Sequence, residues 1–151
     1  MQWLILFGAK YLILIFLALP FVLWLEKERK LAYRVLASMV LAEILVLILG
    51  RMFPYPRPFE VYGVDRDSFF FIFPTTSSFP SGHTAVSFAA AFTCFFDQKV
   101  WGKLLLIFAF IIGLSRFFAL IHFSHDIIAG AALGLVSAFA IEKLKEGVTW
   151  L

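Results

Sequence analysis

The chain has 151 residues, of which 62% are apolar and 15% are charged, and its mean hydropathy is +0.94. A water-soluble domain of this length needs more polar surface than such a composition supplies, so we expect an integral membrane protein. The net charge of +3 is modest and gives no support to nucleic-acid binding. The single cysteine excludes an internal disulfide and a cysteine-based metal site.

Apolar stretches alternate with short polar ones along the chain. A helix that crosses a bilayer needs roughly 20 residues. The sequence predicts five such spans, at about residues 3–25, 32–50, 82–96, 101–118 and 124–144. The first stretch is long enough to span and lacks an Ala-x-Ala-like end, so no removable signal peptide is expected. The predicted fold is therefore an all-α membrane bundle of about five helices, forming one domain over residues 1–151.

The longest connection, residues 51–81, is rich in proline and aromatic residues. A loop of this length in a compact chain is usually functional or disordered. Its aromatic content, including the run Phe69–Phe73, predicts a lid that lies at the membrane interface. Ser81 is predicted to cap the helix that follows. Gly130 and Gly134 form a small-xxx-small pattern typical of closely packed membrane helices.

If the five helices run alternately up and down, four separate segments bring polar residues to one membrane face. These residues are Arg51, Arg57, Ser81, His83, Arg116, His122 and Asp126. The other face carries the basic residues that the positive-inside rule assigns to the cytoplasm, namely Lys27, Arg29, Lys30, Arg34, Lys99, Lys103, Lys143 and Lys145. We therefore expect the polar cluster and the N-terminus to face a periplasm or the cell exterior, and the C-terminus to be cytoplasmic.

The predicted polar cluster has the composition of an oxyanion site. Arg51, Arg57 and Arg116 would repel one another unless an anion lay between them. The helix that starts at Ser81 and Gly82 points free amides and a positive dipole end at the same place, and Gly82 allows close approach of a ligand. Phosphate is the anion that this arrangement favours. No carboxylate cluster suits a divalent cation, so we expect neither a metal nor another cofactor.

Histidines in the cluster supply the chemistry of phosphoryl transfer. His122 and Asp126 are four residues apart, so on a helix they share a face, and the carboxylate can hold one ring nitrogen while the other attacks. His83 would protonate the leaving oxygen and later activate water. Neighbours on a helix do not face each other, so His125 is not the predicted partner of Asp126. Packing and substrate contact stay open as roles for His125.

These residues resemble the three motifs of the type 2 phosphatidic acid phosphatase (PAP2) superfamily, which run Lys-x6-Arg-Pro, Pro-Ser-Gly-His and Ser-Arg-x5-His-x3-Asp. The second motif is complete at Pro80–His83 and the third at Ser115–Asp126. In the first motif Arg57-Pro58 match, but the lysine position falls on Gly50. Arg51, one residue later, is the nearest basic group and is the expected substitute. The resemblance covers about residues 50 to 135.

The resemblance implies a metal-independent lipid phosphatase with His122 as nucleophile, His83 as acid and base, and Asp126 as the partner of His122. Its substrate would be a lipid phosphate or diphosphate at the outer leaflet of a bacterial-type inner membrane. Candidates are undecaprenyl pyrophosphate, phosphatidylglycerophosphate, phosphatidic acid and lipid A 1-phosphate.

Two alternatives to a lipid phosphatase remain. One is a haloperoxidase that holds vanadate in the same anion site, which the bilayer setting and the aromatic lid disfavour. The other is a non-catalytic protein that binds or transports lipid phosphates. Pure binding needs the arginines but neither a nucleophile nor an acid, so the intact pair of His122 and Asp126 beside His83 argues against it.

Overall fold

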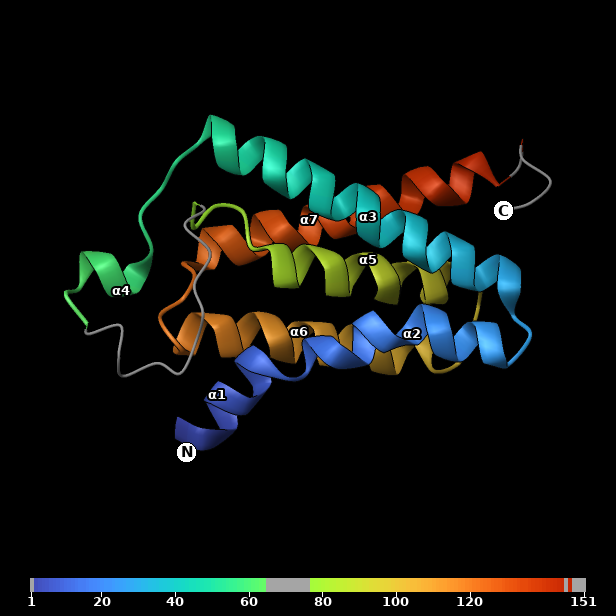
Figure 1. The fold of residues 1–151 in the computed structure, drawn as a ribbon, viewed down its shortest axis with the longest axis horizontal. Coiled ribbons are helices and arrows are strands. Elements are labelled where there is room, and N and C mark those ends of the chain that lie inside the picture. The colour runs from blue at the N-terminus through green and yellow to red at the C-terminus, as the bar shows by residue number, and fades with distance from the viewer. Residues whose placement is uncertain (1, 65–76, 146, 148–151) are drawn as a thin grey trace.

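The computed structural model describes residues 2–64, 77–145 and 147. These residues form helices joined by turns, with no strand in the described part of the chain. The helices are α1 (Gln2–Lys10), α2 (Ile13–Leu25), α3 (Arg29–Met52), α4 (Pro58–Val61), α5 (Gly82–Phe96), α6 (Gly102–Phe118) and α7 (Ser124–Leu144). Figure 1 shows the five long helices side by side in an elongated bundle, with the start of α1 and the end of α7 toward opposite ends.

The first predicted span, residues 3–25, is interrupted. Helix α1 ends at Lys10, α2 begins at Ile13, and the two helices diverge in direction (Figure 1). Pro20 is not the cause, because it lies inside α2. The carbonyl of Ala9 accepts a hydrogen bond of 2.9 Å from Arg116 of α6, so a side chain from another helix satisfies a backbone group at the break.

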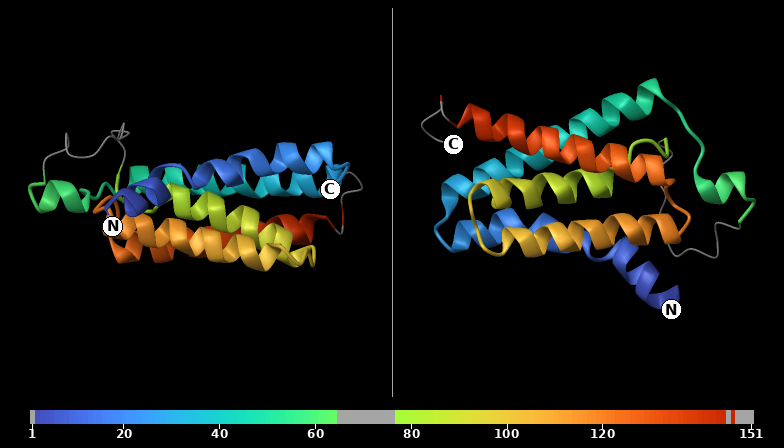
Figure 2. Two further views of the ribbon diagram at one scale, coloured as in Figure 1. Left: turned by 90° about the horizontal axis from the view of Figure 1, so that it is seen from below. Right: turned by 180° about the vertical axis from the view of Figure 1, so that it is seen from behind.

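The other four predicted spans are helical. Helices α5 and α7 have the predicted bounds, whereas α3 extends beyond the predicted range 32–50 at both ends. The connection predicted at 51–81 contains the short helix α4, which projects beyond the bundle (Figures 1 and 2). The predicted aromatic lid at Phe69–Phe73 lies outside the described residues.

Helix α5 is the centre of the bundle, since it contacts α2, α3, α6 and α7. Small residues allow this close packing. A Cβ atom added at Gly130 of α7 would lie 2.6 Å from the carbonyl oxygen of Ser81, and one at Gly134 would lie 2.6 Å from that of Ala85. The small-xxx-small prediction is confirmed. The close contact also sets the first turn of α7 beside the first turn of α5.

Large apolar side chains are exposed on the outside of the bundle. Helices α3 and α7 are long and apolar enough to cross a membrane by length and composition, and α2 and α5 are shorter apolar helices. Exposed apolar surface of this extent marks a membrane or protein contact. Examples from four helices are Leu14, Phe21, Leu36, Ile48, Ile107, Phe110, Ile128 and Phe139.

Candidate active site

Polar residues from four segments meet at one end of the bundle, where α5 and α7 begin and α6 ends (Figure 1). His83 is the second residue of α5 and so lies at this end. The residues buried here are Arg57, Ser78, Ser81, Arg116, His122 and Asp126. The convergence predicted from the alternating direction of the helices is therefore present.

The ring of His122 is fixed through its Nδ1 atom. Nδ1 lies 2.7 Å from the carbonyl oxygen of Ser78 and 3.5 Å from Oδ2 of Asp126. A carbonyl oxygen can only accept a hydrogen bond, so Nδ1 carries the proton and Nε2 presents a lone pair. The predicted contact of Asp126 with this ring is present, and the Ser78 carbonyl, which was not predicted, is the closer acceptor.

Asp126 folds back across the first turn of α7. Its Oδ2 accepts hydrogen bonds from the Ser78 hydroxyl (2.6 Å) and from the backbone N–H of Phe123 (2.8 Å). Ser78 thus contacts both members of the predicted pair, with its carbonyl on His122 and its hydroxyl on Asp126. Sequence reasoning missed Ser78, because an uncharged serine ahead of the Pro-Ser-Gly-His motif carries no signal of its own.

Arg57 is held in place by backbone groups. It precedes α4, and its N–H donates to the Glu60 carboxylate at 2.7 Å. Its buried guanidinium donates to the carbonyls of Ile121 (3.2 Å) and Ser77 (3.4 Å). Nη1 also lies 3.5 Å from Nε2 of His122. A guanidinium therefore lies directly beside the nitrogen that presents the lone pair.

Arg116, near the end of α6, is buried and depends on α1 for its position. Nη1 donates to the carbonyl of Ala9, while Nε has no hydrogen-bond partner among the described residues. A Cβ atom at Gly8 would lie 2.3 Å from Oγ and 3.1 Å from Cβ of Ser115, so a side chain at this position would require Ser115 to shift. Sequence analysis did not assign α1 to the site, because its contribution is a backbone carbonyl that any residue could supply.

Ser81 and Gly82 begin α5 as predicted, but their contacts differ from the expected ones. Ser81 is at the N-cap position, yet its Oγ contacts Oγ1 of Thr84 at 2.9 Å and caps no backbone N–H. Its own backbone N–H donates to the carbonyl of Asp126 at 3.0 Å, which joins α5 to α7. A Cβ atom at Gly82 would lie 3.2 Å from the Glu43 carboxylate, so α3 faces this glycine.

Arg51 is the predicted site residue that the structure does not bring into the cluster. It is exposed near the end of α3, whereas Arg57 and Arg116 are buried. A Cβ atom at Gly50 would lie 3.3 Å from the carbonyl oxygen of Phe79, so Gly50 faces the segment that leads to α5. Successive residues of a helix point roughly 100° apart. Gly50 faces this segment and Arg51 is exposed, so the replacement of the motif lysine by Arg51 stays a prediction.

Burial lowers the pKa of His122 to about 4, with the charges of Arg116 and Arg57 adding to the effect and Asp126 opposing it. The ring is therefore unprotonated at neutral pH. Nε2 can act as a nucleophile or accept a proton.

Comparison with known proteins identifies the family of this chain. The sequence model of the PAP2 superfamily matches residues 31–149. The bacitracin transport permease protein BcrC of Bacillus licheniformis is 35% identical over 139 residues, covering 89% of this chain and 67% of that protein. YbjG of Escherichia coli, a proposed undecaprenyl-diphosphatase, is 30% identical over 149 residues, which cover 94% of this chain and 72% of that protein.

A solved structure is also similar. The crystal structure of LpxE from Aquifex aeolicus superimposes with a TM-score of 0.70 and 28% identity, over 90% of this chain and 79% of that one. Family match, relatives and structure lead to the same assignment. The chain belongs to the PAP2 superfamily, among its membrane lipid phosphatases.

Proposed function

We propose that this protein removes a terminal phosphate from a lipid phosphate or diphosphate, without a metal ion, through a phosphohistidine at His122. One observation carries the proposal: Nδ1 of His122 is fixed on the Ser78 carbonyl while Nε2 lies 3.5 Å from Nη1 of Arg57. This geometry points a lone pair at the place where a guanidinium would bind phosphate oxygens.

In the first step, Nε2 of His122 attacks phosphorus and forms a P–N bond. The bond from phosphorus to the leaving oxygen breaks, and His83 gives that oxygen a proton. Arg57 and Arg116 stabilise the charge on the equatorial oxygens. Asp126, whose Oδ2 lies 3.5 Å from Nδ1, stabilises the positive charge that develops on the ring of His122.

In the second step, water attacks phosphorus and His83 takes its proton. The P–N bond breaks, and the electron pair returns to Nε2 of His122 as inorganic phosphate leaves. Nδ1 keeps its proton throughout, hydrogen-bonded to the Ser78 carbonyl, so the same tautomer is ready for the next turnover.

Undecaprenyl diphosphate is the first candidate substrate, because YbjG is similar over 94% of this chain and is a proposed undecaprenyl-diphosphatase. Phosphatidylglycerophosphate, phosphatidic acid and lipid A 1-phosphate are further candidates. We also propose that α1 with α2, and then α3, α5, α6 and α7, make five crossings of a bacterial-type inner membrane. The start of α1 and the end of α7 lie toward opposite ends of the bundle, which supports an odd number of crossings (Figure 1).

The test of the chemistry is phosphate release by detergent-purified protein from these four lipids, with EDTA present. Release that persists in EDTA and is lost in His122→Ala, with the variant folded, is the expected result. Relative rates would identify the preferred lipid. A requirement for added metal, or full activity in His122→Ala, would overturn the mechanism.

The proposed orientation places the site end outside the cell and can be tested by cysteine labelling. The native Cys94 is buried, so single exposed reporters at Val61→Cys and Lys143→Cys mark the two ends of the bundle. In intact cells or spheroplasts, an impermeant maleimide should label the first reporter and not the second. The reverse pattern would place the site on the cytoplasmic face.

Transport or binding of a lipid phosphate is the second candidate, favoured by the permease description of BcrC. The arginines alone would serve this function. Wild-type protein that binds a lipid phosphate without releasing phosphate, and a His122→Ala variant that moves or binds lipid equally well, would support it over catalysis.

A further inference from the structure

His125 lies at the rim of the site, and its ring is held by aromatic neighbours. Its side chain is 57% exposed. The imidazole stacks on the ring of Phe123, with centroids 5.4 Å apart and planes at 9°. The rings of Phe79 and Tyr55 lie 6.2 and 6.3 Å away. Three segments of the chain thus restrict an otherwise exposed histidine.

The restricted ring lies against an unsatisfied oxygen of the site. Nε2 of His125 lies 3.1 Å from Oδ1 of Asp126. Oδ1 is buried and has no hydrogen bond of good geometry from any described residue, whereas Oδ2 accepts from Ser78 and Phe123. A buried carboxylate oxygen without a donor is costly. A small rotation of the exposed ring would point its N–H at Oδ1.

The contact between His125 and Asp126 was not expected from the sequence. Side chains of adjacent helical residues do not face each other. Asp126, however, bends back to the backbone N–H of Phe123, so its carboxylate lies over the start of α7 and not along its side. Oδ1 is thereby brought within reach of the preceding residue.

We propose that His125 is a positioning residue for the phosphoryl-transfer reaction. It donates to Oδ1 of Asp126 and fixes the carboxylate that supports both Ser78 and His122. The inference rests on the proposed phosphatase function. His125 makes no contact with the reacting atoms and acts through Asp126 alone.

Two substitutions distinguish the effect of the His125 hydrogen-bond donor from the effect of its aromatic ring. His125→Phe keeps the stacking on Phe123 and removes the donor, and His125→Gln keeps a donor and removes the aromatic ring. We expect His125→Phe to lower kcat by about tenfold or more with KM nearly unchanged, because a displaced catalytic group slows the chemical step. His125→Gln should retain most of kcat. Tyr62→Leu, which removes another exposed rim ring, is the matched control and should leave kcat unchanged.

A double-mutant cycle tests the route through Asp126. In an Asp126→Asn background, adding His125→Phe should lower the residual kcat by no more than about twofold, because the effect is already lost. Equal kcat in His125→Phe and wild type would overturn the inference, as would full additivity with Asp126→Asn. A raised KM with unchanged kcat would instead make His125 a substrate contact. No phosphate release by the wild type would overturn the proposed function and this inference together.

Discussion

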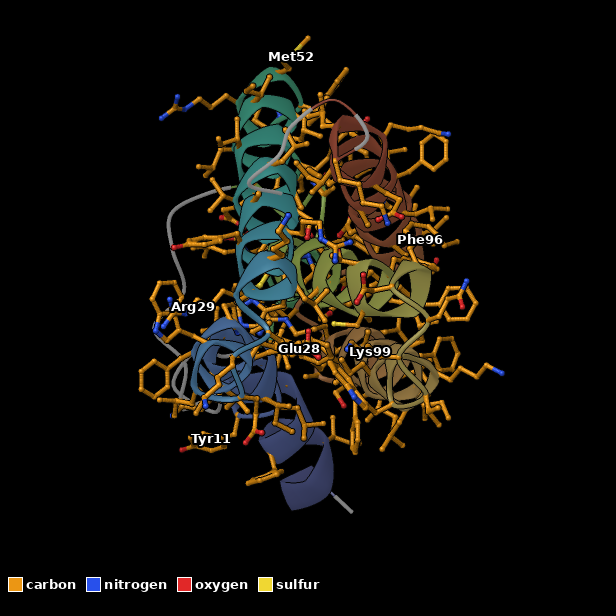
Figure 3. All side chains as sticks on the ribbon, turned by 90° about the vertical axis from the view of Figure 1, so that its right-hand side faces the viewer. Tyr11, Glu28, Arg29, Met52, Phe96 and Lys99 are labelled. Atoms are coloured by element: carbon orange, nitrogen blue, oxygen red, sulfur yellow. The ribbon has the colours of Figure 1, made fainter. Side chains whose placement is uncertain are left out.

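Buried arginines have different hydrogen-bond partners at the two ends of the bundle. At the site end, the guanidinium of Arg116 donates to a backbone carbonyl, that of Ala9. At the other end, Arg34 of α3 contacts two carboxylates, Asp97 at 2.5 Å and Glu142 at 3.3 Å. Figure 3 views the bundle from this second end, where the nearby pair of Glu28 and Lys99 is joined at 2.8 Å.

A carbonyl satisfies a guanidinium's hydrogen bonds but does not cancel its charge, whereas a carboxylate does both. The charge of Arg116 therefore remains available for an anion, while that of Arg34 is neutralised within the protein. The same residue type provides a binding site at one end and a structural link between α3, α5 and α7 at the other. Arg34, counted from sequence as a basic residue of the cytoplasmic face, is buried in this link.

The largest effect expected from this difference is on catalysis. Arg116→Gln should lower phosphate release by about 100-fold to 1000-fold, since a charge aimed at the transition state is lost. The thermal unfolding midpoint should fall less than in Arg34→Gln, because Arg116 has no carboxylate partner among the described residues and only its hydrogen bond to the Ala9 carbonyl is lost. Arg116→Lys, which retains a charge, should be affected less. A midpoint lowered as much as in Arg34→Gln would break the comparison.

The next effect is on stability at the opposite end. Arg34→Gln removes the buried cation that joins Asp97 to Glu142. Each carboxylate is then left, among the described residues, with only a more exposed lysine, Lys99 and Lys145 respectively, which should lower the free energy of unfolding by about 3 kcal/mol. Thermal unfolding in detergent measures this change. The activity of the folded fraction should stay near that of the wild type, because Arg34 is at the far end from the site. Loss of activity without loss of stability would contradict the structural role.

A smaller effect is expected on the pH dependence of stability, through His122 at the site end. His122 has a pKa of about 4 when folded against an ordinary value of 6.5, so below pH 6.5 the unfolded chain binds a proton that the folded site does not. The free energy of unfolding is therefore unaffected by His122 well above pH 6.5 and decreases as the pH falls from 6.5 to 4. The decrease reaches about 2 kcal/mol at pH 5. His122→Gln should therefore show a flatter loss of thermal midpoint from pH 7.5 to 5. Parallel curves for the two proteins would count against this assignment.

The smallest effect is expected at the exposed pair. Lys99→Gln breaks the contact with Glu28 and a longer one of 4.0 Å with Asp97, and it should shift the thermal midpoint too little to measure, because exposed ion pairs contribute little. It is the matched control for Arg34→Gln, since both substitutions remove a cation from the same end. An equal loss of stability in the two variants would show that burial does not decide which ion pairs matter.

Much of the fold could be predicted because apolar runs are a direct consequence of composition. The bounds of α5 and α7 and the packing of Gly130 and Gly134 follow from helix period and residue size. The break between α1 and α2 could not be predicted. It coincides with a backbone carbonyl taken up by Arg116, which is 107 residues away in the chain.

Sequence by itself determined the class of the protein and the residue types of the site. Spacing placed the arginines, His83, His122 and Asp126 at one end, because alternating helices return to the same face. Tertiary structure alone decided which groups hold them. The Ser78 and Ala9 carbonyls, the exposed position of Arg51 and the contact of His125 with Asp126 depend on backbone atoms and side-chain directions. A one-dimensional pattern of residue types does not encode these, because every residue has a carbonyl and only the fold determines where it points.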